Sequence, residues 1–145
     1  MEPDVSRRRI LSTFGVASTF GVTGCLGSNP QSSESTDADI TVEITPDRRF
    51  DPSSVTITAG QTIEWVNRSR PLQTVTADED RIPSQQAYFA SGGFKREIMA
   101  RIAYPLLGGL RTGDRYGHTF GEPGTYGYFS IPYERAGMKG TVLVE

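Results

Sequence analysis

The stretch TYGYFSIPYERAGMKGTVLV, residues 125–144, decides the fold of this chain. It opens with an alternating strand pattern that places Tyr126, Tyr128 and Ser130 on one face, because successive strand side chains point to opposite sides. A loop follows, and residues 140–144 then read as a last strand that closes a sheet. This end of the sequence therefore predicts two β-strands joined by a loop.

Earlier segments show the same alternation of apolar and polar residues, with turn signals between them. Strands that recur about every 8 to 12 residues are typical of a sandwich rather than a parallel sheet. Trp65 lies in one of these segments and is expected to fill the core. We predict an all-β domain with further strands at residues 40–45, 55–59, 62–67, 72–76 and 115–120.

The segment at residues 83–110 breaks this rhythm. It contains an apolar cluster at residues 87–94, and residues 98–107 follow neither the strand nor the helix period cleanly. We interpret the segment as an insertion that packs over one end of the sandwich, and a short helix within it is compatible with the pattern.

The N-terminus carries an export pattern. Residues 6–11, SRRRIL, match a twin-arginine signal, and the apolar stretch at residues 10–24 is shorter than the roughly 20 residues that a membrane helix needs. The sequence VTGC that ends at Cys25 resembles a lipobox, in which the cysteine is lipidated. We predict a twin-arginine lipoprotein signal peptide at residues 1–24; the alternative is that Cys25 is an idle thiol.

Residues 25–38 are polar and small, and we expect a disordered tether before a folded domain at residues 39–145. The predicted location is the outer face of the cytoplasmic membrane. The predicted partners are membrane lipid, through Cys25, and an exported or membrane-associated protein. With 15 basic and 17 acidic residues and no basic stripe, the chain is not expected to bind nucleic acid. A single cysteine excludes an internal disulfide.

Four passages together resemble one known family. They are FDPSSVTITAGQTIEWVN from Phe50, PLQTVTADEDRIP from Pro71, the hairpin that begins at Gly113 and runs through EPGTY, and the loop from Ser130 to Met138 with the strand after it. The region resembles the cupredoxins, most closely the plastocyanin and halocyanin-type blue copper proteins. The resemblance implies a Greek-key β-sandwich of about seven to eight strands.

The resemblance also implies where copper ligands would lie. The family loop reads Cys-x2-His-x4-Met, and the same spacing here reads Ser130-x2-Tyr133-x4-Met138. The family's first histidine falls on Gln73. A blue copper site needs two imidazoles, a thiolate and a weak axial thioether. Of the four positions, only Met138 retains the residue type of the family.

The substituted side chains are poor ligands for copper. A serine alcohol does not ionise as a cysteine thiol does, whose pKa is about 8.5, and an amide oxygen is a neutral, hard donor. We therefore predict that no copper is bound. Gln73, Ser130 and Tyr133 are expected to form a small hydrogen-bonded cluster, because a buried polar group without a partner costs about 1–3 kcal/mol. Met138 is expected to be ordinary packing.

The remaining candidate residues favour structural roles. His118, the only histidine, alternates with aromatic residues and is expected to be hydrogen-bonded in or beside the core. The acidic residues 78–80 are typical of a solvated turn, or of a face that steers a basic partner. Asn67 begins an N-glycosylation sequon, NRS. Ser130 has no nucleophile motif around it, so an enzyme is not expected.

Two hypotheses of function follow. The first is an exported, lipid-anchored cupredoxin-fold protein that has lost its metal and acts as a binding or accessory module, with Phe129, Ile131 and Pro132 as a docking surface. The second keeps the family's role, a small copper-binding electron carrier, and is favoured by the overall resemblance and Met138. A third hypothesis, an enzyme that uses Ser130 or Tyr133, has no positive support.

Overall fold

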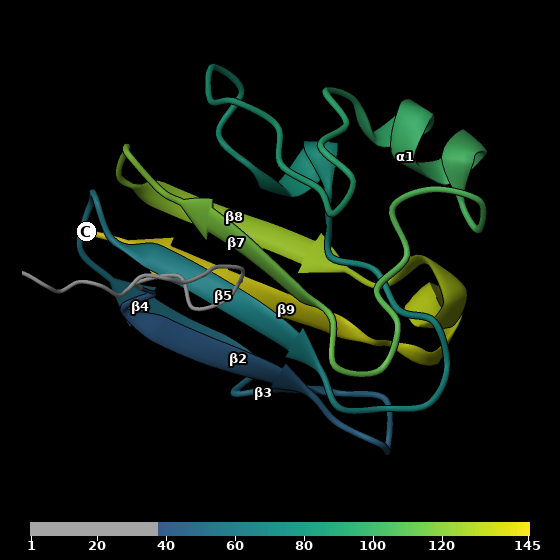
Figure 1. The fold of residues 1–145 in the computed structure, drawn as a ribbon. Coiled ribbons are helices and arrows are strands. Elements are labelled where there is room, and N and C mark those ends of the chain that lie inside the picture. Colours follow the sequence, from purple (N-terminus) through teal and green to yellow (C-terminus); the bar gives the residue numbers. More distant parts are fainter. Residues whose placement is uncertain (1–37) are drawn as a thin grey trace, which may run out of the picture. The chain divides into compact units, whose positions relative to one another are not determined.

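The computed structural model describes residues 38–145, which fold into two four-stranded sheets packed face to face (Figure 1). The predicted signal peptide, Cys25 and all but the last residue of the predicted tether lie outside the described residues. Within the described part, no helix is long and apolar enough to cross a membrane.

The first sheet has the order β3-β2-β5-β7. Strand β2 runs parallel to β5, with Val42 opposite Trp65, while β7 pairs antiparallel to β5. These pairings place alternate residues of β5 in the core. The strands are β2 (Ile40–Ile44), β3 (Phe50–Asp51), β5 (Thr62–Asn67) and β7 (Arg115–Thr119).

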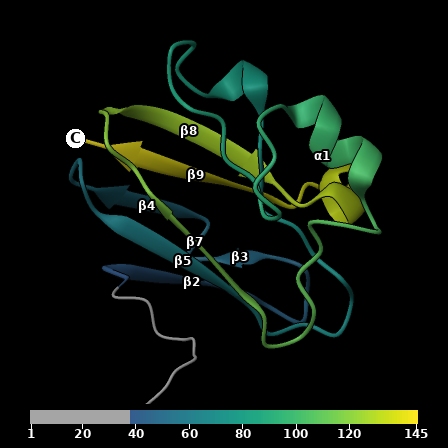
Figure 2. The same cartoon turned by 45° about the horizontal axis from the view of Figure 1, so that its top comes forward.

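The second sheet has the order β4-β9-β8-β6 and lies across the core from the first, as the tilted view also shows (Figure 2). Strand β9 is central, because it pairs parallel to β4 and antiparallel to β8. The predicted β-sandwich is thus confirmed. The strands are β4 (Ser54–Ile57), β6 (Thr76–Ala77), β8 (Gly124–Phe129) and β9 (Lys139–Val144).

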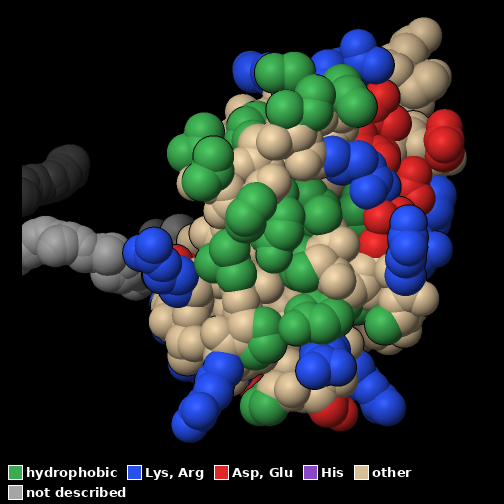
Figure 3. Space-filling model, turned by 90° about the vertical axis from the view of Figure 1, so that its right-hand side faces the viewer, with side chains coloured by type: hydrophobic (Ala, Val, Ile, Leu, Met, Phe, Trp, Pro, Cys, Tyr) green, Lys and Arg blue, Asp and Glu red, His purple; other side chains and the backbone are tan. Residues whose placement is uncertain are grey.

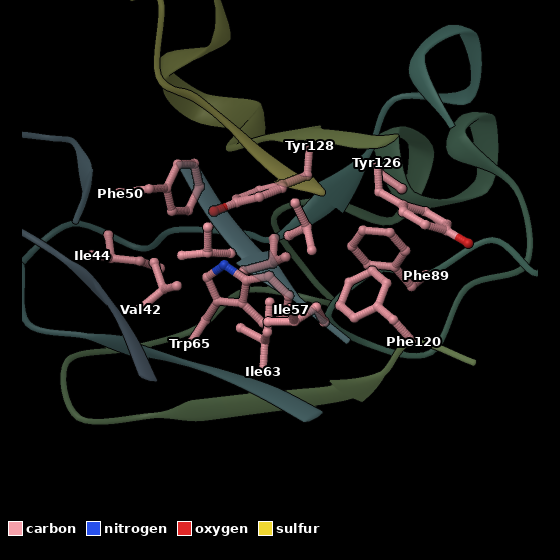
Figure 4. Close-up of a cluster of buried hydrophobic side chains, with 14 of the residues drawn as sticks. Val42, Ile44, Phe50, Ile57, Ile63, Trp65, Phe89, Phe120, Tyr126 and Tyr128 are labelled. Atoms are coloured by element: carbon pink, nitrogen blue, oxygen red, sulfur yellow. The ribbon is translucent and has the colours of Figure 1, made fainter. Parts of the chain in front are cut away.

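Trp65 is the centre of the core and is fully buried (Figure 4). Its ring stacks against Phe89 and meets Tyr128 edge-on, with ring centroids 6.2 and 5.3 Å away. Tyr128 in turn lies over Gly140, where an added Cβ would come within 2.3 Å of the tyrosine ring. The aromatic core therefore requires a residue without a side chain at position 140.

The predicted strand at residues 72–76 is wrong in extent. The strand β6 has only two residues, and Gln73 makes an isolated bridge to Leu110 instead of joining a ladder. The reason is that serine hydroxyls from elsewhere in the chain accept the backbone N–H groups of Thr74 and Val75, which a strand would pair with its neighbours. The N–H of Thr74, for example, donates to the hydroxyl of Ser130.

The insertion contains the short helix α1 (Glu97–Ala103), and a 3-10 turn η2 (Glu79–Arg81) precedes it along the chain. A second 3-10 segment, η3 (Ile131–Ala136), forms the loop between β8 and β9. Figures 1 and 2 both show α1 and η3 at the same end of the sandwich, beyond the end of β8.

Candidate functional site

The fold brings the four positions that the sequence matches to copper ligands to one end of the sandwich. Ser130 ends β8 and precedes η3, Tyr133 lies inside η3, and Met138 precedes β9. Backbone hydrogen bonds close this loop: the N–H of Ser130 donates to Met138 at 3.2 Å, and the N–H of Met138 donates to Tyr133 at 3.2 Å. Gln73 approaches the loop from the segment before β6.

Gln73 and Ser130 meet directly and are both fully buried. The hydroxyl of Ser130 donates to Oε1 of Gln73 at 2.8 Å and accepts the N–H of Thr74 at 3.0 Å. The same Thr74 accepts the N–H of Ile131 on its own hydroxyl at 2.9 Å. The predicted contact between Gln73 and Ser130 is therefore confirmed.

Two further residues extend this arrangement. Nε2 of Gln73 donates to the hydroxyl of Ser69 at 3.1 Å, and that hydroxyl donates to Oδ1 of Asn67 at 2.6 Å. Nδ2 of Asn67 donates to the carbonyl of Leu110 at 2.7 Å. We call these residues the polar cluster: Asn67, Ser69, Gln73, Thr74 and Ser130.

The polar cluster changes the interpretation of the NRS triplet. Asn67 is fully buried and its amide donates to two carbonyls, those of Pro71 and Leu110. The folded domain therefore does not present Asn67 to a glycosylating enzyme. The sequence offered only a weak signal for the true role, namely a short polar residue at the end of a strand, where side chains bind nearby backbone.

Tyr133 does not join the polar cluster, contrary to the prediction. Its half-buried ring packs beneath the guanidinium of Arg48, 4.7 Å from the ring centroid. The reason is that Gln73 and Ser130 satisfy one another without a phenol, whose hydroxyl would need a further buried partner. Met138 is 3% exposed and belongs to the hydrophobic core, as predicted.

Comparison with known proteins gives the family. Residues 37–145 match the model of the copper binding proteins, plastocyanin/azurin family. The chain belongs to this family. It is 39% identical over 110 residues to plastocyanin of Scenedesmus fuscus, which covers 74% of this chain and all of that protein. It is 32% identical to chloroplastic plastocyanin of Tetradesmus obliquus, which covers 66% of this chain and 58% of that protein.

Solved cupredoxin structures share the fold. An amicyanin mutant in its oxidized form aligns with a TM-score of 0.55 at 23% identity, over 77% of this chain and 87% of that one. A purple cupredoxin from Nitrosopumilus maritimus aligns with a TM-score of 0.52 at 23% identity, over 74% of this chain and all of that one. The chain is thus a plastocyanin-like cupredoxin, and its family consists of copper-binding electron carriers rather than enzymes.

His118 lies on β7, away from the copper-ligand positions of the cupredoxin fold. Its ring stacks on Phe89 and meets Phe120 edge-on, each with centroids 4.7 Å apart. Burial lowers the pKa of His118 below its usual 6.5, because the charged form is poorly solvated there. The predicted hydrogen bond is wrong: within the described residues the imidazole makes aromatic contacts only.

Phe129 is not a surface residue, so the predicted docking surface needs correction. It is 1% exposed, and the guanidinium of Arg101 on α1 lies 4.7 Å from its ring centroid. Ile131 and Pro132 are half-buried. The sequence pattern could not reveal this, because the side chain that covers Phe129 comes from the irregular insertion.

The acidic residues 78–80 take part in local structure. Asp78 accepts the N–H of Asp80 and begins η2, while Glu79 pairs with Arg96 at 3.0 Å. The Arg96 guanidinium holds the pKa of the Glu79 carboxyl below its usual range. Among residues 38–145, no three His, Cys, Asp or Glu side chains come together in a group that could hold a metal ion.

Proposed function

We propose that this chain is an exported, lipid-anchored cupredoxin-domain protein that acts as a metal-free binding or accessory module. The supporting observation is the hydrogen bond between Ser130 and Gln73, two of the positions that the sequence resemblance matches to copper ligands. Both side chains are fully buried and bind each other instead of pointing at a shared centre.

The donor set does not fit a blue copper ion. Oε1 of Gln73 already accepts a hydrogen bond, and the hydroxyl of Ser130 both donates and accepts one. Metal binding would break these buried hydrogen bonds and would offer neutral oxygens and one thioether in exchange. Copper in such proteins takes imidazole and thiolate ligands, so the exchange is unfavourable.

The alternative is the role of the relatives, a copper-binding electron carrier. The identity to the Scenedesmus fuscus plastocyanin and the buried Met138 favour it. The two proposals differ in one measurable property, which is whether the folded domain takes up copper stoichiometrically.

The first experiment loads the domain Asp37–Glu145 with Cu(II), removes free metal by dialysis, and measures bound copper and the absorption spectrum. This piece forms one compact unit and matches the full length of the Scenedesmus fuscus relative, so it is expected to fold alone. We expect copper at background and no visible band. Stoichiometric copper with an intense visible band would return the chain to electron transfer.

A reversion tests the placement of the site. The triple variant Gln73→His, Ser130→Cys and Tyr133→His restores two imidazoles and a thiolate beside Met138, and we expect it to bind Cu(II) and turn blue. The matched control Gln73→His with Tyr133→His lacks the thiolate and is expected to stay without that band. A folded triple variant that remains colourless would show that these positions do not converge on a metal site.

Export and anchoring rest on the N-terminal sequence alone, and they are tested separately. We expect the full chain, made in a host with twin-arginine export, to fractionate with membranes through a lipid on Cys25. The variant Cys25→Ser should then appear in the soluble exported fraction. If the variant and the native chain fractionate alike, lipid anchoring through this residue is wrong.

A further inference from the structure

The helix α1 is amphipathic with its apolar side outward. Its charged residues Glu97 and Arg101 face the domain, where they make ion pairs and hydrogen bonds. Its apolar residues are exposed, and the turn after it continues the pattern. We call these residues the α1 surface: Ile98 (55% exposed), Met99 (51%), Ile102 (70%), Leu106 (90%) and Leu107 (63%).

Polar contacts hold α1 in this orientation. Glu79 accepts the N–H of Glu97 at 2.5 Å, and the carboxylate of Glu97 accepts the N–H of Glu79 at 2.9 Å. At the other end, Arg101 forms two parallel hydrogen bonds to Glu134 of η3, at 2.8 and 2.9 Å. Paired charges of this kind are geometrically specific. The apolar side chains are therefore held at the surface, where a contiguous patch usually marks a contact site.

Two arginines lie in the segments near the chain end of the α1 surface. Gln73 and Leu110 exchange backbone hydrogen bonds at 3.1 and 2.7 Å, so the segments around them run side by side. Arg70 therefore lies near Arg111, which follows Leu107 by four residues along the chain. Both are exposed, and within the described residues neither forms an ion pair.

The charge around the α1 surface is unevenly distributed. No Asp or Glu occurs between Ile98 and Gly113, whereas residues 78–80 gather acids beside the start of α1. Figure 3 views this end of the molecule and shows apolar side chains in a band with basic side chains around it, and acidic ones gathered at the upper right with more at the lower edge. The acids nearest the helix, Glu79, Glu97 and Glu134, form ion pairs with Arg96 and Arg101.

We propose that the α1 surface inserts into the headgroup boundary of an anionic lipid membrane, with Arg70 and Arg111 against lipid phosphates. This inference rests on the proposed binding role and names its partner. Apolar side chains that project from a short helix and turn suit a fluid surface, which closes around them, and adjacent cations add attraction to anionic lipid. The acidic margin beside residues 78–80 would tilt away from the membrane.

The test measures binding of the domain Asp37–Glu145 to vesicles by flotation, without Cys25 and therefore without any lipid anchor. Vesicles of phosphatidylglycerol with phosphatidylcholine are compared with phosphatidylcholine alone, at low and high salt. We expect binding to the anionic vesicles that weakens with salt, because exposed charges are screened. Arg70→Gln with Arg111→Gln should weaken it roughly fivefold per cation, since each contributes about 1 kcal/mol.

The apolar part is tested by Ile102→Ser, Leu106→Ser and Leu107→Ser together, which should weaken vesicle binding at least about tenfold. The matched control is Leu143→Ser on β9, an exposed apolar residue (39%) outside the α1 surface, which should bind as the unchanged domain does. Thermal unfolding of each variant establishes that it is folded before binding is compared.

Other results would overturn the proposal. A domain that stays free of both kinds of vesicle, or binds equally after the serine substitutions, does not use this surface for lipid. Self-association that the serine substitutions abolish, without vesicle binding, would assign the surface to a second copy of the chain. Copper analysis is independent of these outcomes. If vesicle binding fails while copper stays at background, only the membrane proposal is contradicted. If vesicles bind and the domain also takes up copper, only the metal-free role is contradicted.

Discussion

The polar cluster and the α1 surface both depart from the usual placement of side chains. The first buries polar side chains inside the domain, and the second exposes apolar side chains on its outside. In the polar cluster, amide and hydroxyl groups are fully buried next to the core. On the α1 surface, large apolar side chains are between 51% and 90% exposed. The two regions lie at the same end of the sandwich and are linked through η3, which contains Glu134 and begins after Ser130.

The two regions differ in whether the described chain itself provides contact partners for their side chains. Within the described residues, the only buried side-chain polar atoms that lack a partner are Nε1 of Trp65 and the hydroxyl of Tyr128, both outside the polar cluster. The cluster is therefore satisfied by its own chain, whereas the α1 surface has no cover from the described chain. Substitutions in the cluster should change stability, and substitutions on the α1 surface should change binding.

The largest expected effect is that of Gln73→Ala. It removes an amide that bonds Ser130 and Ser69 and leaves a cavity among fully buried groups. We expect a loss of about 3 kcal/mol in the free energy of unfolding, from a cavity and from two buried hydroxyls that each lose one hydrogen bond. Urea denaturation measures it. A loss below about 0.5 kcal/mol would mean that water replaces the amide, and the cluster would then not be self-contained.

Ser130→Ala should cost less, about 1–3 kcal/mol, because it leaves Oε1 of Gln73 and the N–H of Thr74 without their partner. A double-mutant cycle with Gln73→Leu isolates the contact. The double variant should lose less free energy of unfolding than the two single variants together, because neither side chain of the pair is left without its partner when both are replaced. Strict additivity would contradict the hydrogen bond between these two side chains.

Arg101→Gln tests the ion pairs that fix the orientation of α1. The guanidinium holds two carboxylates and covers Phe129, but it is 35% exposed, so the loss should be at most about 1 kcal/mol. The effect should be local: amide hydrogen exchange should accelerate in α1 and remain unchanged in β5 and β9. Equal acceleration of amide exchange in all three elements would show that α1 does not open independently of the sheets.

The sequence predicted the sandwich because alternation along β2, β4 and β9 reports directly on burial. It also predicted the meeting of Gln73 and Ser130, through the resemblance. It could not predict that Asn67 would reach Leu110, 43 residues away, or that Arg101 would reach Glu134, 33 residues away. Such pairs depend on how the insertion folds back, and the period of its residues does not encode this.

A smaller effect is expected from pH. Burial lowers the pKa of His118 in the folded domain, so the unfolded chain takes up a proton first as the pH falls below the usual value of 6.5. The stability associated with neutral His118 is thus present above pH 6.5 and is lost as pH falls through this value toward the folded pKa. Urea midpoints at pH 7.5 and 5.5 measure it, and His118→Phe should reduce the difference. An unchanged difference would assign it to other groups.

The smallest effect on stability is expected on the α1 surface. Leu106→Ser replaces a side chain that is 90% exposed, so little apolar burial is lost and the free energy of unfolding should change by less than about 0.5 kcal/mol. The matched substitution Leu110→Ser, four residues later but 7% exposed, should cost several-fold more. If Leu106→Ser is as costly as Leu110→Ser, Leu106 is buried in solution, and the contrast between a self-contained cluster and an uncovered surface fails. If it is neutral for folding yet weakens vesicle binding, Leu106 serves a contact outside the domain.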